Sequence, residues 1–349
     1  MLIHNEKELF VQGNPLRNVN NIKEIDIDEV CDYTEKIAKQ LKEYRVVNVK
    51  GKPHFKIDNQ FNVIYKTDKG EIRQSNITQT AFSQLCKYLG LPVKYVLKCF
   101  EYGKEDLALA NFKTWSNDFE TNIVFKEFDG VIRGVVSETY QSFSNRRTVQ
   151  TLKQTVDLNK YMLIQSCVSP EKLTLRFIER EPTTVVGDKS PIWNGFMVTN
   201  NDIGGGSLKM QDFLYRQWCT NGMTMQAFSG NAIRQAHKGE NMSDGKIAMF
   251  SQALRAIEEL KEEKFKLIEK GSKKRLSFEE YNVLIEKTRR NLKLSEKATD
   301  NLENIIQSSY GLTEWGVANG ITELAQNFTL ETRLEMESFA GNQLVQNLK

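Results

Sequence analysis

Three consecutive glycines near the middle of the chain are the residues whose chemistry stands out first. Gly204, Gly205 and Gly206 lack a Cβ atom, so their backbone can reach positive φ or approach a ligand closely. The residues around them are turn formers, which hydrogen-bond to their own backbone: Asn200, Asn201, Asp202 and Ser207. The stretch predicts a glycine-rich turn between two strands, and a turn of this kind also suits a ligand-binding loop.

The strand predicted directly after this turn, residues 210–218, mixes charged, amide and aromatic side chains. Because successive residues of a strand point to opposite faces, Arg216 and Trp218 share one face and Tyr215 lies on the other. Cations neutralise phosphates and rings stack on bases, which is how single-stranded nucleic acids are bound. An ordinary sheet strand with one half-exposed face has the same pattern, so the strand alone does not decide between these interpretations.

Basic residues gather on both sides of an Asn-Gly turn, Asn221 and Gly222, which is predicted to close this strand. Between residues 209 and 238 there are four Lys or Arg and one acid, a local excess of three positive charges (4 − 1). The predicted nucleic-acid site consists of Lys209, Tyr215, Arg216, Trp218, Arg234, His237 and Lys238. Phosphate contacts from such a patch make binding weaken as salt rises. We therefore expect single-stranded DNA to bind beside the triple glycine.

Two other classes of function remain open. In a hydrolase or nuclease, His237 would act as a general base and Asp202, Asp212 or Glu323 would hold a metal ion. No pair of acids has a recognisable motif spacing, however, so we predict no catalytic residue, no metal and no cofactor. In an interaction or virion-associated protein, the helices predicted within residues 244–293 would contact a host protein or further copies of the chain.

Composition limits the class of protein. The chain has 349 residues, with 48 Lys and Arg against 45 Asp and Glu, so the net charge of +3 gives no general affinity for nucleic acid and any such site must be local. The hydrophobic content of 40% is typical of a soluble globular protein. The five scattered cysteines indicate reduced thiols, and no apolar run approaches the about 20 residues of a membrane helix. We expect a cytoplasmic protein that binds no membrane.

The elements that position these residues predict an α+β fold with a mainly antiparallel sheet built from hairpins. Helices near the N-terminus precede the hairpins, and Asp129-Gly130 is the clearest hairpin turn. From about residue 240 the apolar spacing changes to the helical period of three and four. The predicted division is an α+β body over residues 1–240 and a helical region over residues 241–349, which also fit one continuous domain.

The helical region is predicted to include a projecting helical hairpin within residues 244–293, broken at residues 271–275. Ser277 and Glu280 match a capping box for its second helix. Three more helices are expected near residues 296–309, 314–327 and 330–347. In the second of these, Asn319 and Glu323 share one face, and we expect them to support the basic region around Arg234 and His237.

Five elements of the chain, in this order, resemble a family of uncharacterised phage and plasmid proteins, the domain-of-unknown-function 932 family. The matching elements are Val136–Tyr140, Asn200–Gly206, Leu214–Met223, Arg234–Gly239 and Trp315–Glu323, within a resemblance that spans roughly residues 75–345. The resemblance implies a mobile-element protein in the cytoplasm of a bacterial host. It implies no settled activity, and the expectation of a single-stranded DNA ligand fits the elements in which such DNA is abundant.

Overall fold

The computed structural model describes residues 10–13, 23–58, 60–141, 143–185, 188, 190–216, 221–224, 233–235 and 244–348. In these residues the chain forms two β-sheets with helices around them, so the α+β class is confirmed. The expected single sheet is wrong, because the hairpins before residue 138 and those after residue 160 build separate sheets.

The N-terminal sheet has the strand order β2-β6-β7-β5-β4-β3. Its strands are β2 (Lys42–Val46), β3 (Phe55–Ile57), β4 (Val63–Lys66), β5 (Ile72–Ile77), β6 (Ile123–Phe128) and β7 (Val131–Ser137). The predicted hairpin turn between β6 and β7 is confirmed, since Asp129 and Gly130 have φ of 52° and 71°. The pairing of β5 with β7 is parallel, and it joins segments that local turn signals do not connect.

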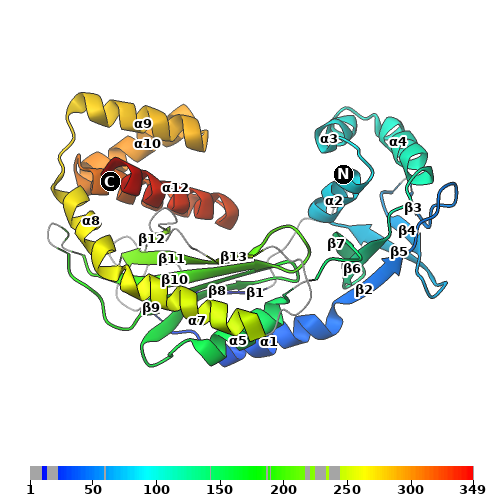
Figure 1. The fold of residues 1–349 in the computed structure, drawn as a ribbon. Helices are drawn as coiled ribbons and strands as arrows, with labels where there is room; N and C mark the ends of the chain where they lie inside the picture. Colours follow the sequence, from blue (N-terminus) through cyan, green and yellow to red (C-terminus); the bar gives the residue numbers. More distant parts are fainter. Residues whose placement is uncertain are drawn as a thin grey trace.

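Three helices pack on one face of the N-terminal sheet and complete the N-terminal lobe (Figure 1). They are α2 (Gln79–Tyr88), α3 (Val93–Glu101) and α4 (Glu105–Asn117). The Thr78 hydroxyl accepts a hydrogen bond from the Ala81 amide and so caps α2. Phe82, Leu85 and Phe112 are buried from the helix side of this core, and Phe125 is buried from the sheet side.

The central sheet is antiparallel throughout, in the order β1-β8-β9-β10-β11-β12, and β13 pairs with the same strand as β12. Its strands are β1 (Phe10–Gly13), β8 (Tyr161–Val168), β9 (Lys172–Glu179), β10 (Ile192–Asn201), β11 (Leu208–Arg216), β12 (Asn221–Thr224) and β13 (Ile233–Gln235). Helices α1 (Ile27–Gln40), α5 (Asn145–Thr155) and α7 (Asp244–Glu259) lie beneath this sheet in Figure 1 and share its core.

The C-terminal helices stand over one end of the central sheet, and the N-terminal lobe stands at its other end (Figure 1). They comprise α8 (Lys261–Lys273), α9 (Phe278–Leu292), α10 (Glu296–Ile305), α11 (Glu314–Leu324) and α12 (Leu330–Leu348). A π-helical turn, Ile306–Tyr310, follows α10. The capping box of Ser277 and Glu280 at the start of α9 is confirmed.

The helical hairpin expected to project from the body packs against it instead. Helix α7 buries Phe250, α8 buries Ile268 and α9 buries Tyr281, so all three contribute to the hydrophobic core. The predicted break at residues 271–275 is shifted, because α8 continues through Gly271 to Lys273. A Cβ atom on Gly271 would lie 2.9 Å from Leu348 Cδ1, so this glycine serves close helix packing rather than a turn. No described helix is both long and apolar enough to cross a bilayer.

Candidate functional site

The glycine-rich turn connects β10 to β11, as its sequence predicts. Gly204 has φ of +81°, a conformation that favours glycine, and a Cβ atom there would lie 2.8 Å from Val136 Cγ1. The Asn201 side chain accepts hydrogen bonds from the amides of Ile203 (3.2 Å) and Gly205 (2.7 Å). The Asn201 side chain therefore stabilises the turn by bonding to the backbone of the residues that follow it, which is the role that its residue type predicts.

This turn is also the place where the two sheets are joined. Lys126 of β6 donates a hydrogen bond to the Asp202 carbonyl at 2.9 Å and lies 3.6 Å from the Asp202 carboxylate. Gln84 of α2 donates to the Ile203 carbonyl at 2.9 Å, and Tyr140 donates to the Asn201 carbonyl at 3.3 Å. We call these contacts the inter-sheet joint.

Buried charge is concentrated at the inter-sheet joint. Lys126 and Asp202 are both buried, and nearby the buried Arg133 of β7 pairs with Glu171 at 2.8 Å. Burial, together with the charge of Asp202, raises the pKa of Tyr140, so this phenol stays a hydrogen-bond donor at neutral pH. The glycine turn is thus held against protein groups along one side, and it is not an open ligand loop there.

Arg216 and Tyr215, two members of the predicted site, are buried. The Arg216 guanidinium donates from Nε and Nη2 to the two carboxylate oxygens of Asp188, each at 2.7 Å. Tyr215 packs edge-on against Trp193 beneath α12. Since an acid already neutralises Arg216 and the ring of Tyr215 is covered, neither side chain lies at a surface that a nucleic acid could contact.

The described contacts of Asn319 and Glu323 lie around α11, and their expected support of the region around Arg234 and His237 stays a prediction. Asn319 is buried in α11 and donates to the Trp315 carbonyl at 2.8 Å within its own helix. Glu323 accepts a hydrogen bond from the Tyr310 hydroxyl at 2.6 Å, and the Tyr310 ring lies 5.3 Å from the Arg216 guanidinium. These contacts stabilise the surroundings of Arg216 in the described structure.

Lys209 and Arg234 are brought together by the strand register. Lys209 of β11 is opposite Arg234 of β13, and on its other side it is opposite Thr199 of β10. Thr199 is in turn opposite Thr174 of β9. Residues directly opposite one another in adjacent strands lie on the same face of a sheet, so the register forms one transverse row, which we call the threonine–lysine row.

The threonine–lysine row borders a cavity of about 500 Å³ between the end of the central sheet and the N-terminal end of α12. Lys209 is half-buried there and pairs with none of the described acids. Lys172 lies on the same wall, 3.8 Å from Glu331 of α12, and both of these side chains are exposed. An exposed pair at this distance is weak and screened by salt.

The remaining predicted residues fall into two groups. Trp218, His237 and Lys238 lie outside the described residues. Asn221 and Gly222 belong to β12, opposite Arg216 and Tyr215, so they extend the sheet rather than close a turn. A Cβ atom on Gly222 would lie 2.3 Å from Phe213 Cε2, which explains the need for glycine at this position.

The acids of the alternative metal site do not meet. Asp202 lies in the inter-sheet joint, Glu323 bonds to Tyr310, and Asp212 is fully buried beside Lys264 at 2.7 Å. Within the described ranges, no three His, Cys, Asp or Glu side chains are placed to hold a metal ion.

Sequence reasoning missed two buried charge networks beside the row. On one face of the sheet, the fully buried Lys264 ammonium donates to Asp212 at 2.7 Å and to Asn194 at 2.6 Å. On the opposite face, Arg176 pairs with Glu337 of α12 at 2.5 Å. Burial lowers the pKa of Arg176 to about 10 despite this pairing. The cation of Arg176 in the middle of β9, between apolar residues, is the signal that could have identified this second network.

The sequence model of one protein family matches residues 133–343, and its description is "Domain of unknown function (DUF932)". The match covers more than half of the chain, so the chain belongs to this family, as its sequence elements indicated. The matched range begins at β7 rather than near residue 75, so most of the N-terminal lobe precedes it. No curated protein and no solved structure matches the chain.

Proposed function

We propose that this member of the DUF932 family binds nucleic acid, with single-stranded DNA as the ligand, along the threonine–lysine row of the central sheet. The observation that carries the proposal is the register that sets Lys209 opposite Arg234 at the end of this row. The two basic residues are 25 positions apart in the chain (234 − 209), and the fold makes them neighbours.

The chemistry of the row suits a phosphate backbone. Ammonium and guanidinium groups neutralise phosphates, and the hydroxyl of the half-buried Thr199 can donate a hydrogen bond to a phosphate oxygen, whereas Thr174 is buried. Lys172 adds a further cation on the wall of the adjoining cavity. The opposite wall carries the acids Glu331 and Glu335, so a phosphate backbone would follow the side of the cavity formed by the row. Arg216 and Tyr215 take no part in this proposal because they are buried, and base stacking by Trp218 stays a prediction.

The test is a fluorescence anisotropy titration of the full chain with labelled oligo(dT) of about 20 nucleotides, a length that exceeds typical single-domain site sizes. The titration is repeated between about 50 and 200 mM salt, with the wild type, Lys209→Gln and Arg234→Gln. Each phosphate contact contributes roughly 0.7 to the slope of log affinity against log salt for single strands, so each substitution should lower the slope by about that amount.

Lys287→Gln is the matched control, because Lys287 is exposed on α9, away from the row. It should leave both affinity and slope unchanged. Absence of binding by the wild type at the lowest salt, or equal slopes for the wild type, Lys209→Gln and Arg234→Gln, would remove the proposal.

A further inference from the structure

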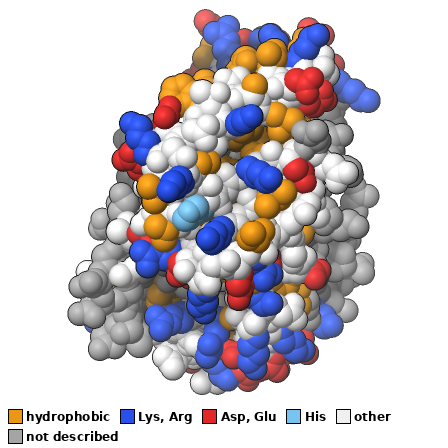
Figure 2. Space-filling model, turned by 90° about the vertical axis from the view of Figure 1, so that its right-hand side faces the viewer, with side chains coloured by type: hydrophobic (Ala, Val, Ile, Leu, Met, Phe, Trp, Pro, Cys, Tyr) orange, Lys and Arg blue, Asp and Glu red, His pale blue; other side chains and the backbone are white. Residues whose placement is uncertain are grey.

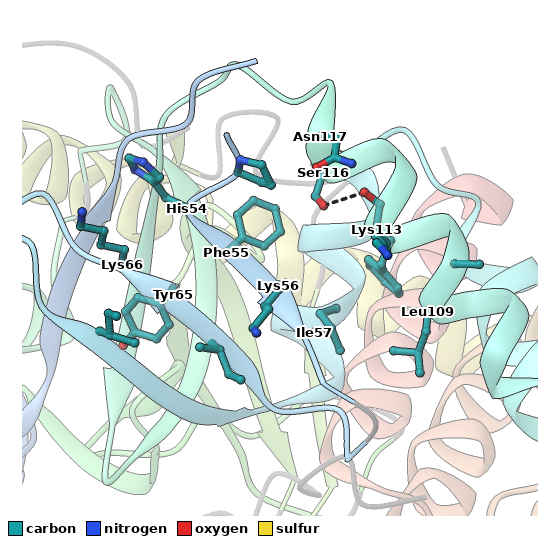
Figure 3. A pocket seen from close by; sticks show the side chains of 15 residues that line it. His54, Phe55, Lys56, Ile57, Tyr65, Lys66, Leu109, Lys113, Ser116 and Asn117 are labelled. Atoms are coloured by element: carbon teal, nitrogen blue, oxygen red, sulfur yellow. Dashed lines mark hydrogen bonds between the residues drawn. The ribbon is translucent and has the colours of Figure 1, made fainter. Parts of the chain in front are cut away.

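The N-terminal lobe carries a second surface that the threonine–lysine row does not involve. A groove of about 560 Å³ runs over β3 and β4 and along α4, and we call it the lobe groove (Figure 3). Lys56 and Lys66 line it from the strands, His54 from the residue before β3, and Leu109 and Lys113 from α4. All of these residues precede the range matched by the DUF932 family, so the lobe groove belongs to the part of the chain outside that match.

The charge of the lobe groove has one sign. Lys56, Lys66 and Lys113 are exposed around it, and its described lining contains no acid. Figure 2 shows the same side of the molecule, where lysine and arginine side chains surround apolar ones. Three exposed ammonium groups around a concave surface attract an anionic ligand.

The outward faces of the strands alternate cations with aliphatic side chains. Lys56 is opposite Ile64 across β3 and β4, and Lys66 is opposite Ile72 across β4 and β5. Ile64 is half-buried and Ile72 is 77% exposed, although both are isoleucines that a sheet commonly covers. An exposed aliphatic surface of this kind on the rim of a charged groove is typical of a binding site for an amphipathic partner.

The main chain of β3 adds hydrogen-bonding groups. β3 is the last strand of its sheet, and its pairing with β4 is flanked by main-chain hydrogen bonds of His54 and Asp58 with Lys66 and Asn62. In an antiparallel pair, alternate residues direct their amide and carbonyl groups to opposite sides. The corresponding groups of Phe55 therefore point away from β4, where an extended peptide can pair with them.

From these observations we propose that the lobe groove binds an extended acidic segment of a partner protein, in which carboxylates alternate with aliphatic residues. The carboxylates would pair with Lys56 and Lys113, with Lys66 adding attraction from β4, and the aliphatic side chains would pack toward Ile64 on the neighbouring strand. A peptide fits better than a nucleic acid because the rings at the floor are already packed: Phe55 and Tyr65 are buried edge-on against Phe125. They offer no open face on which a base could stack.

The experiment selects peptides that bind the full chain from a phage-displayed library of random sequences. The peptides are about 12 residues long, because a strand commonly has about 5–6 residues and must fit within them. Counter-selection uses Ala110→Trp, which places an indole in the groove from an exposed position of α4 without changing any charge. Recovered peptides are synthesised and titrated by anisotropy against the wild type, Ala110→Trp and the double variant Lys56→Glu/Lys113→Glu. The matched control is Lys287→Glu/Lys297→Glu, which reverses two exposed lysines of the C-terminal helices.

We expect peptides rich in Asp and Glu alternating with Ile, Leu or Val. Their affinity should fall at least about tenfold in the double reversal, equivalent to 1.4 kcal/mol, and remain unchanged in the control. Oligo(dT) binding should be the same in the wild type and the double reversal, which separates this proposal from the DNA site. Recovery of no peptide specific for the wild type, of peptides without acids, or loss of oligo(dT) binding in the double reversal would overturn it. A thermal melt of each variant checks that it is folded. If Ala110→Trp does not fold, the affinity of the double variant Lys56→Glu/Lys113→Glu decides the test.

Discussion

Arg216 and Asp188 form a two-pronged ion pair in which both side chains are almost completely buried, with exposed fractions of 11% and 2%. The Trp315 indole donates a third hydrogen bond to the Asp188 carboxylate at 2.7 Å, and the Ser190 amide donates a fourth at 2.9 Å. The pair therefore ties the end of β11 and the loop before β10 to helix α11. This explains why a cation predicted to contact a ligand serves the fold.

Removing either partner of this pair should destabilise the protein strongly. Arg216→Ala leaves a buried carboxylate and Asp188→Ala leaves a buried guanidinium, so each should lower the free energy of unfolding by about 3–5 kcal/mol. The double variant should lose less than the sum of the two, by roughly 0.5–3 kcal/mol. Urea denaturation of the four proteins measures these values, and strictly additive losses would contradict the coupling.

The surface pair of Lys273 and Glu269 provides the control for this cycle. Lys273 is exposed and Glu269 is partly exposed, and the pair lies within one helix, at positions i and i+4. Lys273→Ala should cost no more than about 1 kcal/mol, because the pair is screened by solvent.

Acid should remove the contribution of Asp188. Burial by itself would raise the pKa of this carboxyl, but the hydrogen bonds from Arg216, Trp315 and Ser190 outweigh it and hold the pKa below the ordinary value of 3.8. A carboxyl whose pKa is depressed on folding stabilises the protein above its unfolded pKa, and this stability is lost as pH falls through the folded pKa. The stability difference between the wild type and Asp188→Asn should be constant near pH 6 and shrink below about pH 4. Urea titrations along this range measure it, and a constant difference down to about pH 3 would contradict the assignment.

The elements that the sequence predicts correctly are those whose signals are local. Asp129 and Gly130 both adopt the positive φ that their hairpin turn requires, and Ser277 with Glu280 forms the expected capping box. The two-sheet arrangement was not predictable in this way. It depends on the parallel pairing of β5 with β7, which no turn signal specifies, since α2, α3, α4 and β6 lie between them in the chain.

The candidate site was predicted less well, because alternation along β11 identifies its two faces but not what covers them. Helix α12 covers the face of Tyr215, and α11 with the loop at Asp188 covers the end at Arg216. Of the three members Lys209, Tyr215 and Arg216, whose burial the structure describes, Lys209 alone stays partly exposed. The contacts that bury Tyr215 and Arg216 come from residues more than 20 positions away in sequence, Trp193 and Asp188, beyond the reach of periodicity.

Substitutions in the triple glycine should differ sharply from one another. Gly204→Ala places a side chain at φ of +81° and within 2.8 Å of Val136 Cγ1, so it should lower the free energy of unfolding by about 1–3 kcal/mol. Gly206→Ala should cost less, because its φ lies outside the positive region and its nearest contact, Asn201 Cβ, is 3.3 Å away. Urea denaturation of the two variants provides the comparison, and equal losses would mean that the inter-sheet joint does not constrain Gly204.

The buried pair of Lys264 and Asp212 allows a similar test in the middle of the sheet, where Asn194 is the third member. Lys264→Met leaves the Asp212 carboxylate buried without its ammonium partner, which should cost about 3–5 kcal/mol in free energy of unfolding. Adding Asp212→Asn removes that charge and gives Asn194 a new amide partner. The double variant should therefore be more stable than Lys264→Met alone.

Lys266→Met on the same helix is exposed and should stay within about 0.5 kcal/mol of the wild type. A double variant less stable than Lys264→Met would show that the buried charge of Asp212 is compensated by groups other than Lys264. Contacts other than the ion pair of Lys264 and Asp212 would then stabilise the sheet at this position.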